Sequence, residues 1–314
     1  MKLSICIPTY NGGDKLRICL ECLLKATNGL SDVEIIVSDN GSTDNTSEVL
    51  ESYADQGIIT TYRNKSNIGF SGNLKLLIDN YASGEYCWVI GDDDFVDFES
   101  VKFLLQVIDM HSPDYISIRH RCMTMEDYNV CTNDGEKNAI EYFEGSYFKC
   151  LDGNSSSTNI LGTFMTTQLF KLSPIKKFDK SNYGFLQWDS FRGTFPNSFM
   201  MTETFAKEGK CVCVSTPIVT ALIHPKAWDD KLVMIQQEIL PDYLNYCYTL
   251  TREAKRELRN TRYCIYRDKF LVNYKLFKSV NYSQVDFKLL INKDFYNFIT
   301  GYIHKKIRIY TNAV

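Results

Sequence analysis

The first hundred residues alternate short apolar segments with amphipathic helical segments, and this alternation restricts the fold more than any other feature of the sequence. Both faces of the apolar segments are hydrophobic, which is typical of parallel strands covered by helices on each side and joined by right-handed crossovers. The predicted strands are residues 3–8, 33–38, 57–63 and 85–90, and the predicted helices are residues 14–26, 43–55 and 71–81. We therefore expect an α/β domain with a mostly parallel central sheet flanked by helices.

The alternation weakens beyond residue 112, and the last ninety residues have a helical composition. The later predicted strands are residues 115–120 and 211–216, and the later predicted helices are residues 232–250, 252–276 and 287–308. The expected organisation is a catalytic domain over residues 1–228, with halves 1–110 and 111–228, and a helical extension over residues 229–314.

Composition and charge exclude several classes of protein. A hydrophobic content of 44%, with 20 Tyr and 19 Phe, argues against a disordered chain. A net charge of −3 argues against a dedicated nucleic-acid binder. From Pro225 onward the chain carries 16 Lys and Arg against 9 Asp and Glu. A basic C-terminal part of this kind is able to face an anionic surface, although solvated helix faces give the same count.

We expect a cytoplasmic protein, because neither an export signal nor an apolar window long enough to span a membrane is visible. Membrane contact would then be peripheral, at the inner face of the cytoplasmic membrane. The 11 Cys residues are expected to be buried thiols. Cys19 and Cys22 form the one CxxC pair, but they lie in a helical pattern with no second pair, which favours core packing over zinc.

In an α/β sheet the ligand lies beyond the carboxyl ends of the strands, so these loops are where the functional residues are expected. The strongest feature there is Gly91 followed by Asp92, Asp93 and Asp94. Three neighbouring carboxylates repel one another unless a cation neutralises them, and their hard oxygen atoms suit Mg²⁺ or Mn²⁺. The alternative is an exposed acidic turn or a helix N-terminus.

Three other segments carry weaker signals, and for each one alone a structural role is favoured. Pro8-Thr9-Tyr10-Asn11 is a turn whose ring and amide are able to contact a planar base. Asp39 ends a strand, where it is able to accept hydrogen bonds from a ligand. The loop from Asn67 through Gly69 to Asn73 opens a helix and is able to meet a phosphate. It is neither a Walker A loop nor a dinucleotide fingerprint.

Taken in order, the segments PTYN, EIIVSDNGSTD, NIGFSGN and GEYCWVIGDDD resemble the GT-A fold glycosyltransferases of family 2. This family contains inverting enzymes that use nucleotide-diphospho-sugars, and the resemblance is strong over residues 3–98. It implies a UDP-, GDP- or CDP-linked donor, an Mg²⁺ or Mn²⁺ ion, and a glycan or polyprenyl-linked acceptor. It also implies a role in surface polysaccharide synthesis, such as that of capsule or O-antigen. Residues 1–110 would then bind the nucleotide sugar and residues 111–228 the acceptor.

The resemblance implies a role for each matching residue. Residues 8–11 resemble the start of a nucleoside pocket, and Asp39 resembles the carboxylate that reads the base. Asp92 matches the position that faces the ribose, Asp93 the metal ligand, and Asp94 closes the cluster. The residues Asn67, Gly69 and Asn73 are expected at the donor. The common family form has Asp in place of Gly91, so the division of roles among the three Asp stays open.

An inverting displacement needs a base to take the proton of the acceptor hydroxyl. We expect Asp189, which follows an aromatic residue, or alternatively Glu203, at the start of an expected helix. Neither matches the common Glu-Asp form of the family. His224 follows a predicted strand and is a candidate for contact with the metal or the diphosphate, although a lone His is more often structural.

The C-terminal helices leave three alternatives open: they lie on a membrane, form an oligomer, or pack on the catalytic domain, and packing is favoured. Two other functions also remain. A sugar-nucleotide pyrophosphorylase would carry a Gly-rich basic signature near the first strand, where this chain has only Lys15. A catalytically silent binding subunit would tolerate loss of the acidic residues, which are intact.

Overall fold

The computed structural model describes residues 1–124, 139–156, 159–181, 190–222, 231 and 234–268. Its first part follows the predicted alternation of strands and helices. The elements are β1 (Leu3–Thr9), α1 (Gly13–Thr27), β2 (Val33–Asp39), α2 (Thr46–Ala54), β3 (Thr60–Arg63), α3 (Phe70–Leu76), a π-helical segment (Leu77–Tyr81) and β4 (Tyr86–Val89). Strand β1 pairs in parallel with β2 and β4, and β2 pairs in parallel with β3, which confirms the parallel sheet predicted for this part.

The second part continues the same sheet with mixed directions. Its elements are β5 (Asp94–Val96), α4 (Ser100–His111), β6 (Tyr115–Met123), β7 (Tyr142–Gly145), α6 (Tyr147–Asn154), a 3₁₀ turn (Met165–Thr167), β8 (Gln168–Lys171), α7 (Leu172–Lys176), α8 (Phe191–Thr194), α9 (Pro196–Phe205) and β9 (Cys211–Leu222). The strand order is β3-β2-β1-β4-β8-β6-β9-β5, and β7 pairs with β9. Strand β8 is antiparallel to both β4 and β6, so it joins the two parts into one sheet.

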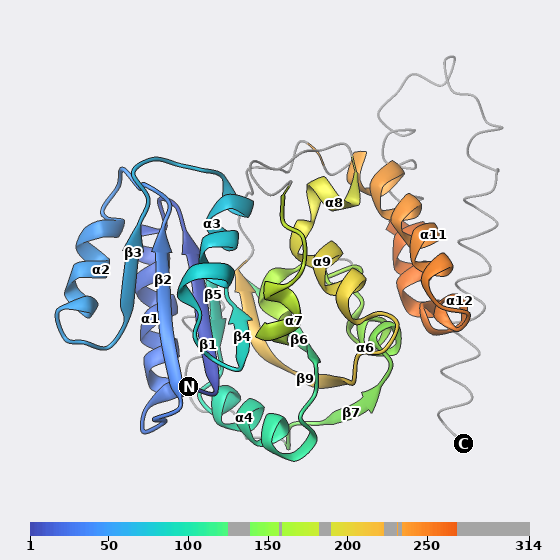
Figure 1. The fold of residues 1–314 in the computed structure, drawn as a ribbon, viewed down its shortest axis with the longest axis horizontal. Coiled ribbons are helices and arrows are strands. Elements are labelled where there is room, and N and C mark those ends of the chain that lie inside the picture. The colour runs from blue at the N-terminus through green and yellow to red at the C-terminus, as the bar shows by residue number, and fades with distance from the viewer. Residues whose placement is uncertain (125–138, 157–158, 182–189, 223–230, 232–233, 269–314) are drawn as a thin grey trace.

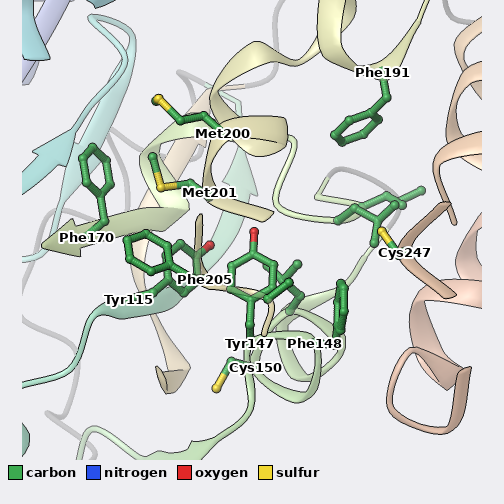
Figure 2. Packing of buried hydrophobic residues seen from close by; sticks show 14 of the residues in the cluster. Tyr115, Tyr147, Phe148, Cys150, Phe170, Phe191, Met200, Met201, Phe205 and Cys247 are labelled. Carbon is green, nitrogen blue, oxygen red and sulfur yellow. The ribbon is translucent and has the colours of Figure 1, made fainter. Parts of the chain in front are cut away.

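The sheet separates two hydrophobic cores because successive side chains of a strand point to opposite faces. Leu3, Ile5 and Ile7 of β1 enter the core under α1 and α4, whereas Cys6 enters the other core. That second core packs against α3, α6, α9 and α11. At its centre the ring of Tyr115 lies 4.9 Å from the ring of Tyr147, and Figure 2 shows both rings among the buried side chains of the cluster.

The C-terminal part contributes a π-helical segment (Ile235–Ile239), α11 (Leu240–Leu250), α12 (Ala254–Glu257) and helical residues 259–268. Helices α11 and α12 lie at the opposite end of the molecule from α2 (Figure 1). Leu244, Cys247 and Ile265 are buried in the core that contains Tyr147. For these residues the packing alternative is confirmed, whereas membrane contact and oligomerisation stay predictions. Among the described helices, none has the length and apolar character needed to cross a membrane.

Several predicted boundaries were wrong: β3 begins at Thr60 and not at residue 57, and β9 continues to Leu222 and does not end at residue 216. Hydrogen bonds explain two further differences. Helix α2 begins at Thr46 rather than near Ser42. Thr46 N donates to Asp44 Oδ1 at 3.1 Å, whereas Ser42 Oγ accepts from Asn11 N and does not cap the helix. Asp94 was expected in a loop. It begins β5 instead, where it pairs with Ala221 of β9. The loop after β2 is therefore longer than predicted, and the backbone of Asp94 is fixed by strand pairing.

Candidate active site

The parallel register brings the polar strand ends together. Thr9 at the end of β1 pairs with Asp39 of β2, and Asp39 pairs with Arg63 of β3. The hydrogen bond from Ile90 N to Cys6 O, 3.0 Å long, extends the β1–β4 pairing to the residue before Gly91. The segments expected to carry the function therefore lie along one edge of the sheet.

The turn after β1 is tied to the loop after β2. Asn11 has a φ of 55°, in the left-handed region that Asn tolerates better than most residues. Its backbone N–H donates to Ser42 Oγ at 2.8 Å, and its side-chain Oδ1 accepts from Thr43 N at 2.9 Å. Tyr10 beside it remains 46% exposed, whereas Pro8 is buried within β1. The two loops therefore support an aromatic ring that is open to a ligand.

Asp39 is 1% exposed and is held from two sides. Its Oδ1 accepts from Ser42 N at 2.8 Å, and its Oδ2 pairs with the guanidinium of Arg63 at 3.0 Å. Arg63 also donates to Ser42 O at 2.8 Å and is itself half exposed. The carboxylate expected to read a base is thus fixed in orientation beside a cationic group.

Four asparagines and Ser38 form a polar network at the ends of β2 and β3, here called the asparagine network: Asn40, Asn64, Asn67 and Asn73. Asn73 accepts from Ser38 Oγ at 2.6 Å and from Asn64 Nδ2 at 3.0 Å, and it donates to Ser38 O at 2.8 Å. Asn40 donates to Asn67 Oδ1 at 2.9 Å and to Gly69 O at 3.2 Å. Hydrogen bonds within the network therefore hold the loop that begins α3.

The carboxylates of Asp92, Asp93 and Asp94, here called the acid cluster, are anchored at the first and the third residue. Thr9 Oγ1 donates to Asp92 Oδ2 at 2.5 Å. A Cβ at Gly12 would lie 2.4 Å from Thr9 Oγ1 and 2.5 Å from Asp92 Oδ2, so only glycine fits beside this bond. Thr9, which is expected at the donor, links β1 to the acid cluster through its hydroxyl.

Asp94 is 2% exposed and accepts a hydrogen bond from Thr166 Oγ1. A Cβ at Gly91 would lie 2.5 Å from Asp94 Oδ2 and 3.1 Å from Asp93 Oδ1. Those two carboxylates therefore flank one point beside the main chain, which the missing side chain of Gly91 leaves open. The family's usual Asp at this position would not fit without a shift of its neighbours.

The chemistry of the acid cluster fits a hard divalent ion, since all its donor atoms are carboxylate oxygens and two of them face the space beside Gly91. Over the described part of the chain, no three acidic, His or Cys side chains are already arranged to hold a metal ion. Asp92 and Asp94 each place one oxygen on a threonine hydroxyl. A metal site here would use the remaining coordination capacity of these side chains together with Asp93.

Cys19 lies beneath the acid cluster, and its thiol contacts Gly91 O at 3.6 Å. Burial, together with the nearby carboxylates of Asp94 and Asp92, raises the pKa of the Cys19 thiol well above its usual value. The thiol therefore stays protonated and is not suited to ligate a metal. Cys22 packs at the edge of the same core, which confirms the structural interpretation of the CxxC pair.

Of the two candidate bases, the structure describes Glu203 but not Asp189. Glu203 lies in the last turn of α9 and not at the start of a helix, because α9 already begins at Pro196. Its Oε1 accepts from Tyr246 Oη of α11 at 2.6 Å. Burial and this hydrogen bond raise the pKa of Tyr246 to about 12, so its hydroxyl stays protonated. Asp189 and His224 lie outside the described residues.

Sequence reasoning missed Arg63, Asn40, Asn64 and Thr166. Arg63 and Asn64 stand at the end of the predicted strand of residues 57–63, and polar residues at a strand end are a local indication of a site. Thr166 had no such signal, because it lies 72 residues from the carboxylate that it contacts. Its partners are decided by the pairing of β4 with β8.

The fold resembles those of solved glycosyltransferases. Staphylococcus aureus TarS, residues 1–349 in complex with UDP, superimposes with a TM-score of 0.59 and 19% identity, covering 96% of this chain and 81% of that one. A mannosyltransferase from Pyrobaculum calidifontis in complex with GDP-Man and Mn²⁺ gives a TM-score of 0.57 at 12% identity, covering 99% and 83%. At these identities the likeness defines the fold alone, and it confirms the GT-A fold.

The sequence profile of glycosyl transferase family 2 matches residues 4–160, which is half of the chain. The abequosyltransferase RfbV of Salmonella typhimurium is 33% identical over 121 residues, covering 38% of this chain and 36% of that relative. The chain belongs to glycosyl transferase family 2, as the four segments indicated. The match to RfbV spans only about a third of that relative, so it defines the family and not the substrates.

Proposed function

We propose that the protein transfers a sugar, with inversion, from a nucleotide-diphospho-sugar to a hydroxyl group of a glycan or polyprenyl-linked acceptor, using Mg²⁺ or Mn²⁺. The observation that carries this proposal is the placement of the acid cluster on the same sheet edge as Tyr10 and Asp39, with Thr9 as the link. An aromatic ring, a fixed carboxylate and a set of metal-binding oxygens are the groups that a nucleoside diphosphate requires.

The donor would be bound by residues of the first half. Tyr10 offers its exposed ring to the base, and Asp39 with Arg63 offers an acceptor and a donor beside it. Loss of the sugar leaves negative charge on the diphosphate, and a divalent ion supplies the charge that stabilises it. The acid cluster would hold that ion, with Asp93 as the principal ligand and Asp92 toward the ribose.

The acceptor hydroxyl must lose a proton as the new bond forms, and we propose Asp189 as the base. The bond between Glu203 and Tyr246 supports a structural role for Glu203, since it links α9 to α11. We propose His224 for contact with the diphosphate. It follows the end of β9, whose Ala221 pairs with Asp94.

We further propose that the protein acts in surface polysaccharide synthesis at the inner face of the cytoplasmic membrane. Relatives named as an abequosyltransferase and as poly(ribitol-phosphate) glycosyltransferases support this setting, as does the excess of Lys and Arg beyond Pro225. Residues 1–228 would form the catalytic domain and residues 229–314 an extension.

Thermal unfolding with UDP, GDP and CDP, each with and without Mn²⁺, tests the proposed donor site. One nucleotide is expected to raise the melting temperature in a metal-dependent way, because ligand binding to the folded state stabilises it. Indifference to all three nucleotides would contradict the proposal. Asp189→Asn should keep this stabilisation and lose transfer. Glu203→Gln serves as its matched control and should keep both.

A further inference from the structure

Thr166 lies in the 3₁₀ turn before β8 and makes three hydrogen bonds, one each with Trp88, Gly91 and Asp94 of the acid cluster. Its hydroxyl accepts from Gly91 N at 2.9 Å and donates to Asp94 Oδ2. Its backbone carbonyl accepts from Trp88 Nε1 at 2.8 Å. Thr166 and Trp88 are both fully buried. One residue of the second half of the chain therefore holds the main chain and one carboxylate of the acid cluster at the same time.

The direction of these bonds is fixed by proton count. A threonine hydroxyl carries one proton, and the amide of Gly91 can only donate. The hydroxyl must therefore accept from Gly91 and turn its single proton to Asp94. The carbonyl bond to the Trp88 indole sets the position of the turn itself, because Trp88 is part of β4 and cannot move without the sheet.

The acid cluster is thus held from two sides. Thr9 donates to Asp92 from β1, and Thr166 donates to Asp94 from the turn before β8. Like charges on neighbouring residues repel, and each of these hydrogen bonds opposes that repulsion by fixing one carboxylate. Each threonine hydroxyl fixes one oxygen of the aspartate to which it donates.

We propose that Thr166 is a positioning residue, which orients Asp94 and Gly91 so that the acid cluster binds a divalent ion. This inference rests on the proposed function. It assigns the second half of the chain a part in metal binding, in addition to the acceptor binding expected for residues 111–228. Because Thr166 Oγ1 already accepts from Gly91 N and donates to Asp94, we assign it a positioning role and not that of a metal ligand.

The test compares Thr166→Val, which removes the hydroxyl, with Thr166→Ser, which keeps it. The affinity of the chain of residues 1–314 for Mn²⁺ alone is measured by the electron paramagnetic resonance signal of free Mn²⁺. Thr166→Val should weaken the affinity about tenfold to a hundredfold, the scale of a hydrogen bond to a charged group. Thr166→Ser should restore it.

Thr167→Val is the matched control. Thr167 lies in the same turn and is as deeply buried, but its hydroxyl binds Phe164 O and Asn159 Nδ2 rather than the acid cluster. This variant should lose stability on thermal unfolding and keep the wild-type affinity for Mn²⁺. Thr166→Ala replaces Thr166→Val where the valine variant does not fold.

The outcomes separate the two proposals. Equal Mn²⁺ affinity in the wild type and Thr166→Val would overturn this inference and leave the proposed function intact. Equal losses in Thr166→Val and Thr167→Val would also overturn it, because the role of Thr166 would then be merely structural. A wild type that binds no Mn²⁺ would overturn the proposed metal-dependent function, and this inference with it.

Discussion

The asparagine network at the ends of β2 and β3 and the acid cluster at the end of β4 lie on the same sheet edge but are built in opposite ways. In the network, amide donors meet carbonyl acceptors, so groups such as Asn73 and Ser38 satisfy one another inside the protein. In the acid cluster, three groups of one charge follow one another in the chain, and Asp92 and Asp94 each accept a hydrogen bond from a threonine hydroxyl.

The difference indicates which part of the site is complete before a ligand binds. A hydrogen-bonded network is stable by itself and holds the loops that present Tyr10 and Asp39. Neighbouring carboxylates repel one another in the ligand-free protein. A bound cation removes this repulsion, and its removal contributes to the free energy of cation binding. The network should therefore govern stability, and the acid cluster should govern ligand affinity.

The largest effect is expected for Asp93→Asn, which removes one charge of the acid cluster. The affinity for the metal–nucleotide complex should fall at least about a hundredfold, while the ligand-free protein should keep its melting temperature or gain slightly, because like-charge repulsion decreases. Calorimetric titration and thermal unfolding measure the two quantities. Asp32→Asn makes the same charge change at an exposed position before β2 and should alter neither.

Asn73→Ala tests whether the asparagine network governs stability. It leaves Ser38 and Asn64 without their buried partner, so the free energy of unfolding should fall by about 2–3 kcal/mol. Denaturant unfolding measures this loss, and Asn28→Ala, at an exposed position after α1, is the control. A loss no larger than that of the control would mean that the network does not hold the site.

Gly12→Ala should give a smaller effect, confined to the link between the two parts of the site. Its backbone φ of −81° suits alanine, but the new Cβ would collide with Thr9 Oγ1 and Asp92 Oδ2. Displacement of Asp92 should weaken nucleotide affinity about tenfold with little loss of stability. Gly72→Ala meets nothing closer than 3.3 Å and should bind as the wild type does. Unchanged binding in both variants would argue against a role for the Thr9–Asp92 bond.

Much of the first half could be predicted because its signals are local. Strands β1, β2 and β4 carry buried and largely apolar runs, and each is followed by polar residues, which in a parallel sheet must meet at one edge. The second half could not be predicted as well. Strand β8 runs antiparallel between β4 and β6, and no pattern of neighbouring residues predicts which strands it pairs with.

The sequence by itself determined the order of strands and helices and the presence of three acids where β4 ends, since hydrophobic periodicity and residue type are properties of adjacent positions. Only the tertiary structure decided which groups hold those acids. Arg63 reaches Asp39 through strand pairing, and Thr166 reaches Asp94 across 72 residues. Contacts between distant residues depend on the packing of the whole sheet, and a single sequence does not encode them in any local pattern.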